Sequence, residues 1–175
     1  MKIGFIGLGN VGGKLAGSLL RNGFDLTVRD LNQEIASPFL DNGAKWGESP
    51  KKIAETVELI ITCLPNPEAS ATVMEADDGV LAGISHGKVW AEMSTTDEEE
   101  VKRLGKMVHE LGGEALDCPV SGGCHRAATG NISIFVGGER SSFEKILPVM
   151  KVLGRRILHT GALGSASVLK VMTNY

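Results

Sequence analysis

A chain of 175 residues can bury one hydrophobic core, so we expect one compact domain with at most a small appendage. Its 18 Lys and Arg residues against 21 Asp and Glu residues give a net charge of -3, which does not favour binding to nucleic acid or to an anionic membrane. No apolar run approaches the roughly 18 residues that a membrane-spanning helix needs. "MKIGFIG" at the N-terminus does not resemble a signal peptide, and we therefore expect a cytoplasmic protein.

Seven short apolar runs, separated by longer amphipathic segments, predict β-strands. They lie at residues 2–7, 25–30, 57–64, 88–93, 114–120, 131–138 and 156–161. Parallel strands need crossover connections, and helices supply them. The alternation therefore predicts an α/β fold with a doubly wound, mostly parallel sheet and helices on both of its faces.

The first predicted strand runs into "GLGNVG", which fits the pattern G-x-G-x-x-G. Its first glycine allows a tight turn, the second lets the backbone approach a pyrophosphate, and the third lets helix and strand pack closely. Glycine-rich turns also occur for packing alone, but here strand, glycines, helix and second strand follow in the order that a Rossmann-like dinucleotide site requires. The candidate cofactor-binding residues in this turn are Gly7, Leu8, Gly9, Asn10, Val11 and Gly12.

Asp30 ends the second predicted strand, where a carboxylate can accept hydrogen bonds from ribose hydroxyls and repel a 2'-phosphate. It therefore favours NAD over NADP. An ordinary solvated aspartate at a strand end is the alternative. The adjacent Arg29 keeps NADP open as the less favoured cofactor.

Two further strand ends offer cofactor contacts, because ligands of open α/β sheets bind beyond the carboxyl ends of the strands. Leu64 and Pro65 end one strand and form either an apolar wall of the site or a simple turn. After the next strand, "STT" supplies hydroxyl groups. We expect Thr96 to cap a helix, and so we prefer Thr95 as the cofactor contact.

Three helix starts are predicted from capping signals. They are Ser49 followed by Pro50, the pair Thr96 and Glu99, and the pair Ser141 and Glu144. Apolar residues at three- and four-residue spacing follow the last two pairs, as expected for helices that cover a sheet.

The stretch "DCPVSGGCHRAATGN" gathers several reactive side chains. Cys118, Cys124 and His125 lack a usual zinc spacing, and with Cys63 the cysteine count is odd, so we expect reduced thiols and no metal site. A nucleophilic serine is not supported either, because "VSGGC" is not a G-x-S-x-G turn. The remaining interpretation is a carboxylate-binding loop formed by a hydroxyl and two unobstructed amides, with a plain turn as the alternative. Its residues are Ser121, Gly122 and Gly123.

The last segment, "ASVLKVMTNY", predicts a helix with two different faces. One carries an apolar stripe of Val168, Val171, Met172 and Tyr175. On the other face, Lys170 and Asn174 are four residues apart and lie beside small residues. Such a lysine is usually solvated, but a lysine partly withdrawn from water near a bound hydroxyl can act as a general base.

Four motifs in this order resemble the β-hydroxyacid dehydrogenase family, which includes 3-hydroxyisobutyrate dehydrogenase, tartronate semialdehyde reductase and 6-phosphogluconate dehydrogenase. They are "GFIGLGNVG", "CLPNPE" with "EMSTT", "DCPVSGG....A..G" and "GALGS....K...N". The resemblance implies that Lys170 is the general acid/base and that Ser121, Gly122 and Gly123 hold the substrate. It also implies that Asn174 orients Lys170 and the substrate, while NAD carries the hydride chemistry.

The resemblance also implies an organisation for the whole protein. We expect a dinucleotide-binding Rossmann domain at residues 1–162, and residues 163–175 as the start of an inter-domain helix that is cut short. The family continues into a helical C-terminal domain that this chain lacks, and a full-length form would be a homodimer or tetramer. The implied activity is NAD-dependent oxidation of a small 3-hydroxyacid to a semialdehyde, or the reverse reaction. The alternatives are a non-catalytic dinucleotide-binding module and an NADP-dependent reductase of glyoxylate or succinic semialdehyde.

Overall fold

The computed structural model describes residues 1–173, so Asn174 and Tyr175 lie outside the described residues. Within the described residues, nine strands form one sheet in the order β3-β2-β1-β4-β5-β6-β8-β7, and β9 pairs with β8. The strands are β1 (Lys2–Ile6), β2 (Asp25–Arg29), β3 (Lys45–Trp46), β4 (Leu59–Thr62), β5 (Val89–Glu92), β6 (Glu114–Asp117), β7 (Val120–Ser121), β8 (Ile132–Gly137) and β9 (Gly154–Gly161). Each of the seven predicted runs overlaps at least one strand.

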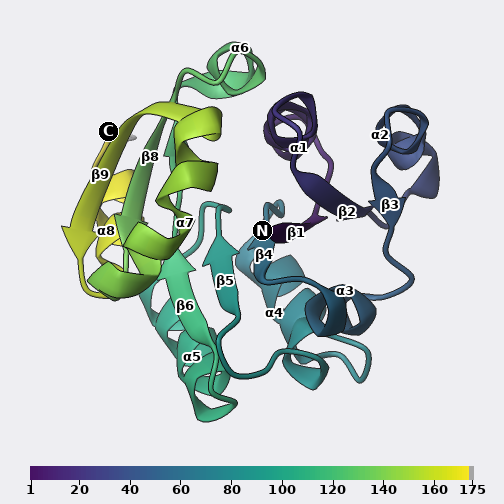
Figure 1. The fold of residues 1–175 in the computed structure, drawn as a ribbon. Coiled ribbons are helices and arrows are strands. Elements are labelled where there is room, and N and C mark those ends of the chain that lie inside the picture. The colour runs from purple at the N-terminus through teal and green to yellow at the C-terminus, as the bar shows by residue number, and fades with distance from the viewer. Residues whose placement is uncertain (174–175) are drawn as a thin grey trace.

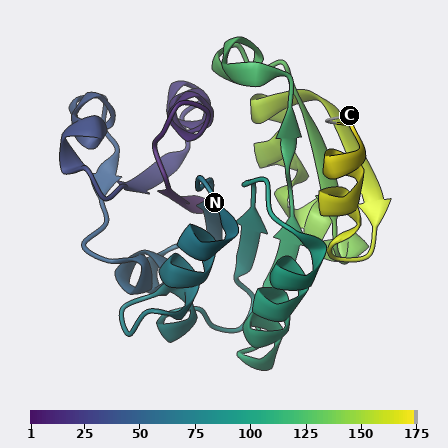
Figure 2. The ribbon, with the colours of Figure 1, turned by 180° about the vertical axis from the view of Figure 1, so that it is seen from behind.

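Helices connect the strands and cover both faces of the sheet (Figures 1 and 2). The α-helices are α1 (Gly12–Arg21), α2 (Ser37–Asp41), α3 (Pro50–Thr56), α4 (Pro67–Glu75), α5 (Glu98–Glu110), α6 (Gly123–Ala128), α7 (Arg140–Leu153) and α8 (Ser165–Met172), and two short 3-10 helices lie at Gln33–Ala36 and Val80–Ala82. In residues 1–173, no helix combines the length and the apolar character needed to cross a membrane.

In the order in which they lie in the sheet, all neighbouring strands from β3 through β2, β1, β4 and β5 to β6 are parallel. The sheet is therefore mostly parallel, as expected. The predicted strand at 114–120 is wrong in one respect, because it is divided into β6 and β7. Asp117 pairs with Gly137 and Val120 pairs with Ile134, both in antiparallel fashion to β8. Pro119 lies at the break, where its missing N–H cannot extend a hydrogen-bond ladder. The division places Ser121 on a short strand of its own.

The sheet separates two hydrophobic cores, because successive side chains of a strand point to opposite faces. Ile61 and Ala91 lie in the core that contains residues of α1 and α7. Their neighbours Ile60 and Trp90 lie in the core that contains residues of α3, α4 and α5. Figure 1 shows α7 in front of the sheet, and Figure 2 shows α5 and α8 in front of the opposite face.

One of the three predicted helix starts is confirmed. The Ser49 side chain accepts a hydrogen bond from the Lys52 amide, and Pro50 opens α3. The start at Ser141 is wrong, because α7 already begins at Arg140, after Glu139, and no side chain caps it. Gly138, with φ of 129°, turns the chain before Glu139, so that α7 can begin at Arg140.

The predicted cap at Thr96 is also wrong. Asp97 caps α5, and its Oδ1 accepts a hydrogen bond from the Glu100 amide at 2.7 Å. The Thr96 side chain is buried, and its hydroxyl has no hydrogen-bond partner among residues 1–173. An aspartate suits this position because its charge also interacts favourably with the N-terminal end of the helix dipole.

Candidate functional site

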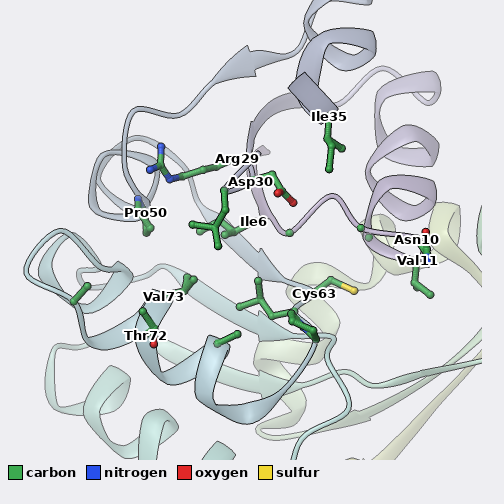
Figure 3. Close-up of a pocket in the computed structure, with 18 of the residues that line it drawn as sticks. Ile6, Asn10, Val11, Arg29, Asp30, Ile35, Pro50, Cys63, Thr72 and Val73 are labelled. Carbon is green, nitrogen blue, oxygen red and sulfur yellow. The ribbon is translucent and has the colours of Figure 1, made fainter. Parts of the chain in front are cut away.

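A cavity of about 740 Å³ opens beyond the carboxyl ends of β1, β2 and β4 (Figure 3). Its wall combines the glycine-rich turn, the end of β2, the segment after β4 and one side of α4. The lining residues from these elements include Gly7, Gly9, Asn10, Val11, Gly12, Asp30, Cys63, Leu64, Pro65, Thr72 and Val73. Most of the predicted cofactor contacts therefore come together around one cavity.

The three glycines of the turn, at positions 7, 9 and 12, have different surroundings. Gly7 has φ of 99°, and a Cβ there would lie 2.2 Å from the carbonyl oxygen of Cys63. A Cβ on Gly12 would lie 2.0 Å from the carbonyl oxygen of Gly7. At Gly9, by contrast, a Cβ would meet no heavy atom within 4 Å among residues 1–173, its two chain neighbours aside. Packing within the chain thus explains Gly7 and Gly12, while Gly9 leaves open space at the cavity wall.

The same turn supplies backbone donors to the cavity. Gly9, Asn10 and Val11 belong to no helix or strand. Their amides donate no hydrogen bond within residues 1–173. They directly precede α1, whose N-terminus adds a partial positive charge. Free amides at a helix N-terminus are a suitable site for phosphate oxygens.

Asp30 fixes the geometry of this turn. Its Oδ2 accepts a hydrogen bond from the Leu8 amide at 2.7 Å, and its Oδ1 accepts one from the Asn32 amide at 3.0 Å. The Leu8 side chain is 3% exposed and belongs to the core, so Leu8 contributes through its backbone. The Asp30 side chain also faces the cavity (Figure 3), where its carboxylate oxygens can accept further hydrogen bonds.

Arg29 points away from Asp30, toward Pro50 (Figure 3). Its Nη1 donates hydrogen bonds to the carbonyl oxygens of Gly47 at 2.8 Å and Glu48 at 2.6 Å. The guanidinium also lies 5.5 Å from the centre of the Trp46 ring, in cation–π contact. Two carbonyl groups and an aromatic ring therefore hold the cation in this position.

The cavity wall at Leu64 is supported by a buried carboxyl group, Glu92, which was not predicted from the sequence. The Leu64 amide donates to Ser94 Oγ at 2.7 Å, and Glu92 Oε1 accepts from the Ser94 amide at 2.9 Å. Burial raises the pKa of the Glu92 carboxyl, although the nearby hydroxyls of Ser94, Ser70 and Thr62 oppose this shift. A charged residue at an inward position of a buried strand was the signal that could have revealed it.

Cys63 lines the cavity beside Leu64, and its sulfur points toward Asn10 and Val11 (Figure 3). Burial raises the pKa of the thiol to about 12. This thiol therefore stays neutral and protonated at physiological pH and gives the cavity an uncharged wall close to the phosphate donors. Thr95 lies outside the cavity and is exposed to solvent, whereas Ser94 is buried.

The predicted carboxylate-binding loop follows β7, which continues from β6 along the same neighbouring strand, β8. Ser121 is half-buried on β7, and Gly122 and Gly123 are exposed, with φ of 131° and 78°. A Cβ on Gly122 would lie 2.9 Å from Cδ of Arg126. Glycine is favoured at both positions because side chains strain this backbone conformation.

The sulfur and imidazole groups of this stretch are dispersed. Cys118 is buried in the core, whereas Cys124 and His125 are exposed on α6. Within the described residues, no three His, Cys, Asp or Glu side chains gather as they would around a metal ion.

Lys170 lies half-buried on α8. Of the small neighbours predicted beside it, Ala166 is buried, while Thr173 is exposed and donates its hydroxyl to the Lys170 carbonyl oxygen at 2.9 Å. The described part of the apolar stripe faces solvent, since Val168, Val171 and Met172 are 40%, 44% and 69% exposed. The predicted role of Asn174 falls outside the described residues.

Comparisons with known proteins give this geometry a family context. A family model described as the NAD binding domain of 6-phosphogluconate dehydrogenase matches residues 2–161. The chain is 36% identical over 174 residues to 2-(hydroxymethyl)glutarate dehydrogenase of Eubacterium barkeri, covering 99% of the chain and 58% of that protein. It is 34% identical over 172 residues to mitochondrial 3-hydroxyisobutyrate dehydrogenase of Rattus norvegicus, covering 98% of the chain and 51% of that protein.

A solved structure of Mycobacterium tuberculosis 3-hydroxyisobutyrate dehydrogenase with L-serine superimposes with a TM-score of 0.93 at 28% identity. The alignment covers 99% of this chain and 58% of that one. The chain thus spans about half the length of the curated relatives it matches. Together the likenesses confirm the expected Rossmann-like fold and the expected dinucleotide-binding domain.

Proposed function

This chain belongs to the family of the 6-phosphogluconate dehydrogenase NAD binding domain, and from that premise we propose that it is the NAD-binding half of a 3-hydroxyacid dehydrogenase. The observation that carries the proposal is Gly9, where no contact within residues 1–173 requires a glycine. A missing side chain beside free amides at a helix N-terminus leaves room for a pyrophosphate.

The residues around the cavity would each hold a part of the dinucleotide. The amides of Gly9, Asn10 and Val11 would bind the pyrophosphate, and Asp30 would accept hydrogen bonds from the ribose hydroxyls. Leu64 and Pro65 would line the nicotinamide side, and Thr95, which lies outside the cavity, stays a predicted contact on that side.

NAD is favoured over NADP for two electrostatic reasons. Asp30 presents a carboxylate that would repel a 2'-phosphate. The cation that could bind such a phosphate, Arg29, is already engaged by the carbonyl groups of Gly47 and Glu48.

The catalytic half of the proposal concerns the substrate loop and α8. When bound, NAD accepts or returns the hydride. Ser121, Gly122 and Gly123 would hold the carboxylate and hydroxyl of a small 3-hydroxyacid, and Nζ of Lys170 would take up or return the hydroxyl proton. Asn174 would orient the lysine. In a longer form of the protein, which we expect to be a cytoplasmic homodimer or tetramer, residues 163–175 would lead from the Rossmann domain into a second domain.

Calorimetric titration of the chain with NADH and NADPH tests the proposal. We expect NADH to bind at least about tenfold more tightly, a difference of about 1.4 kcal/mol. Asp30→Ala should remove most of this preference, because the variant loses both the ribose acceptor and the repulsion of the 2'-phosphate.

Asp25→Ala is the matched control, because this exposed carboxylate lies at the opposite end of the same strand. It should leave the preference unchanged. If neither dinucleotide binds, the proposed function is wrong, and if NADPH binds more tightly, an NADP-dependent aldehyde reductase becomes the better interpretation.

A further inference from the structure

Three buried polar side chains stand next to each other at the carboxyl ends of β4, β5 and β6. Thr62 pairs in register with Glu92, and Glu92 pairs in register with Asp117. All three are at most 1% exposed. Residues two positions earlier on these strands, Ile60, Trp90 and Ala115, belong to the apolar core on that face. The polar row therefore ends this core at the carboxyl ends of the three strands.

Asp117 uses both of its oxygens to bind the first turn of α8. Oδ1 accepts a hydrogen bond from the Gly164 amide at 2.8 Å. Oδ2 accepts one from the Ser167 amide at 2.7 Å and another from Ser167 Oγ at 2.9 Å. Gly164 is the N-cap residue and has no side chain, so a strand residue far away in the sequence caps this helix.

The surroundings of Asp117 are shaped to admit its carboxylate. A Cβ on Gly137 would lie 2.3 Å from Asp117 Oδ1 and 3.0 Å from Ser165 Oγ. Ser165 Oγ in turn lies 2.6 Å from Thr160 Oγ1, which gives the first turn of α8 a second attachment, to β9. Any side chain at 137 would displace the carboxylate, and the helix would lose its cap.

We infer that Asp117 is a positioning residue that fixes α8, and with it Lys170, relative to the Ser121–Gly123 loop. The inference rests on the proposed function, in which the lysine and the loop act on the same substrate. Asp117 is suited to this task because it binds α8 directly and lies only four residues before Ser121. A displacement of about 1 Å between two catalytic groups can cost on the order of 100-fold in rate.

Asp117→Asn discriminates this role from that of an ordinary helix cap. Asparagine normally caps a helix as well as aspartate does. At 117, however, each carboxylate oxygen faces a backbone N–H group, so either orientation of the amide places its NH2 against a donor. Asp97→Asn is the matched control, since Asp97 caps α5 with only one backbone hydrogen bond and is exposed.

Hydrogen exchange of the 175-residue chain is the first measurement. In Asp117→Asn we expect the amides of α8 to exchange at least about tenfold faster, while those of β1, β4 and α1 keep their rates and the Kd for NADH changes less than about twofold. Asp97→Asn should leave the exchange of α8 unchanged. Uniform acceleration across the chain, or no acceleration in α8, would overturn the inference.

Turnover of small 3-hydroxyacids with NAD is the second measurement, with Lys170→Ala as the reference for loss of the proton-transfer group. Asp117→Asn should lower kcat at least about tenfold with a smaller change in KM. A kcat no lower than that of Asp97→Asn would overturn the positioning role. Unchanged turnover in Lys170→Ala would instead refute the proposed role of Lys170, and accelerated exchange of α8 in Asp117→Asn would still show that Asp117 fixes the helix.

Discussion

Glu92 is a buried carboxyl group whose protonation state follows from its surroundings. Water is excluded from it, and its Oε2 has no hydrogen-bond partner among residues 1–173. Ser70 Oγ is likewise buried without a partner of acceptable geometry in that range, although its hydroxyl lies close enough to Glu92 to favour the charged form. Burial costs the charged form more than the neighbouring hydroxyls restore, and the pKa of Glu92 is therefore raised from its ordinary value of 4.5.

The raised pKa of Glu92 makes stability depend on pH. At a pH between the pKa of Glu92 in the unfolded chain and its higher pKa in the folded chain, the folded chain keeps a proton that the unfolded chain has released. Raising the pH through this range therefore favours unfolding. The contribution of this group to stability is full below about pH 4.5 and decreases until the pH passes the folded pKa. Glutamine has nearly the same shape, does not titrate, and its NH2 can donate to the Ser70 hydroxyl.

We therefore expect the free energy of unfolding of Glu92→Gln, relative to that of the original chain, to rise as the pH increases above about 4.5. The rise should be about 1.4 kcal/mol for each unit by which the pKa is raised. Urea unfolding at several pH values measures it, and Glu48→Gln, a change at an exposed carboxyl, is the control. A difference that stays constant with pH would show that Glu92 is charged in the folded chain.

At the scale of elements, the start of α5 shows how local sequence can mislead by one residue. Thr96 with Glu99 and Asp97 with Glu100 are overlapping pairs that both satisfy the capping pattern. In the fold Thr96 is turned into the protein, and Asp97 takes the extended N-cap conformation with φ of -85° and ψ of 159°. The choice depends on how β5 delivers the chain to the helix, which no local pattern contains.

The two candidate caps predict opposite effects on stability. Asp97→Ala should lower the free energy of unfolding by about 1 kcal/mol, because the Glu100 amide loses its acceptor. Thr96→Val should leave it unchanged or raise it, because the variant removes a buried hydroxyl that has no partner in residues 1–173. Urea unfolding of both variants measures the effects, and the reverse order would restore Thr96 as the cap.

The parts of the site that could be predicted from sequence are those that act close to their own position in the chain. The glycines at 7, 9 and 12 serve one turn, and Leu64 and Pro65 end one strand. Asp117 could not be assigned in this way, because its three hydrogen bonds reach residues 47 and 50 positions later. Its charge at an inward position of β6 was the available signal, but its partner is defined only by the packing of α8 on the sheet.

At the scale of the whole molecule, one edge of the sheet brings together groups from distant parts of the chain. The carboxyl ends of β1, β2 and β4 face the cavity, and those of β5 and β6 carry Glu92 and Asp117. Because parallel strands all end on the same side, the fold places the glycine-rich turn and the anchor of α8 along one edge. A ligand bound there contacts several elements at once and should therefore stabilise the whole domain.

We expect NAD at about 100 times its Kd to stabilise the chain by about 2.7 kcal/mol. At about 2–4 °C for each kcal/mol, the Tm should rise by roughly 5–10 °C. Gly9→Ala should keep the Tm of the ligand-free chain within about 2 °C, because its Cβ meets no other residue of 1–173 beyond its chain neighbours, but should lose most of the rise. Gly12→Ala should lower the Tm of the ligand-free chain, because its Cβ would lie 2.0 Å from the Gly7 carbonyl oxygen. Thermal unfolding with and without NAD measures all three chains, and an undiminished rise in Gly9→Ala would place the pyrophosphate away from this turn.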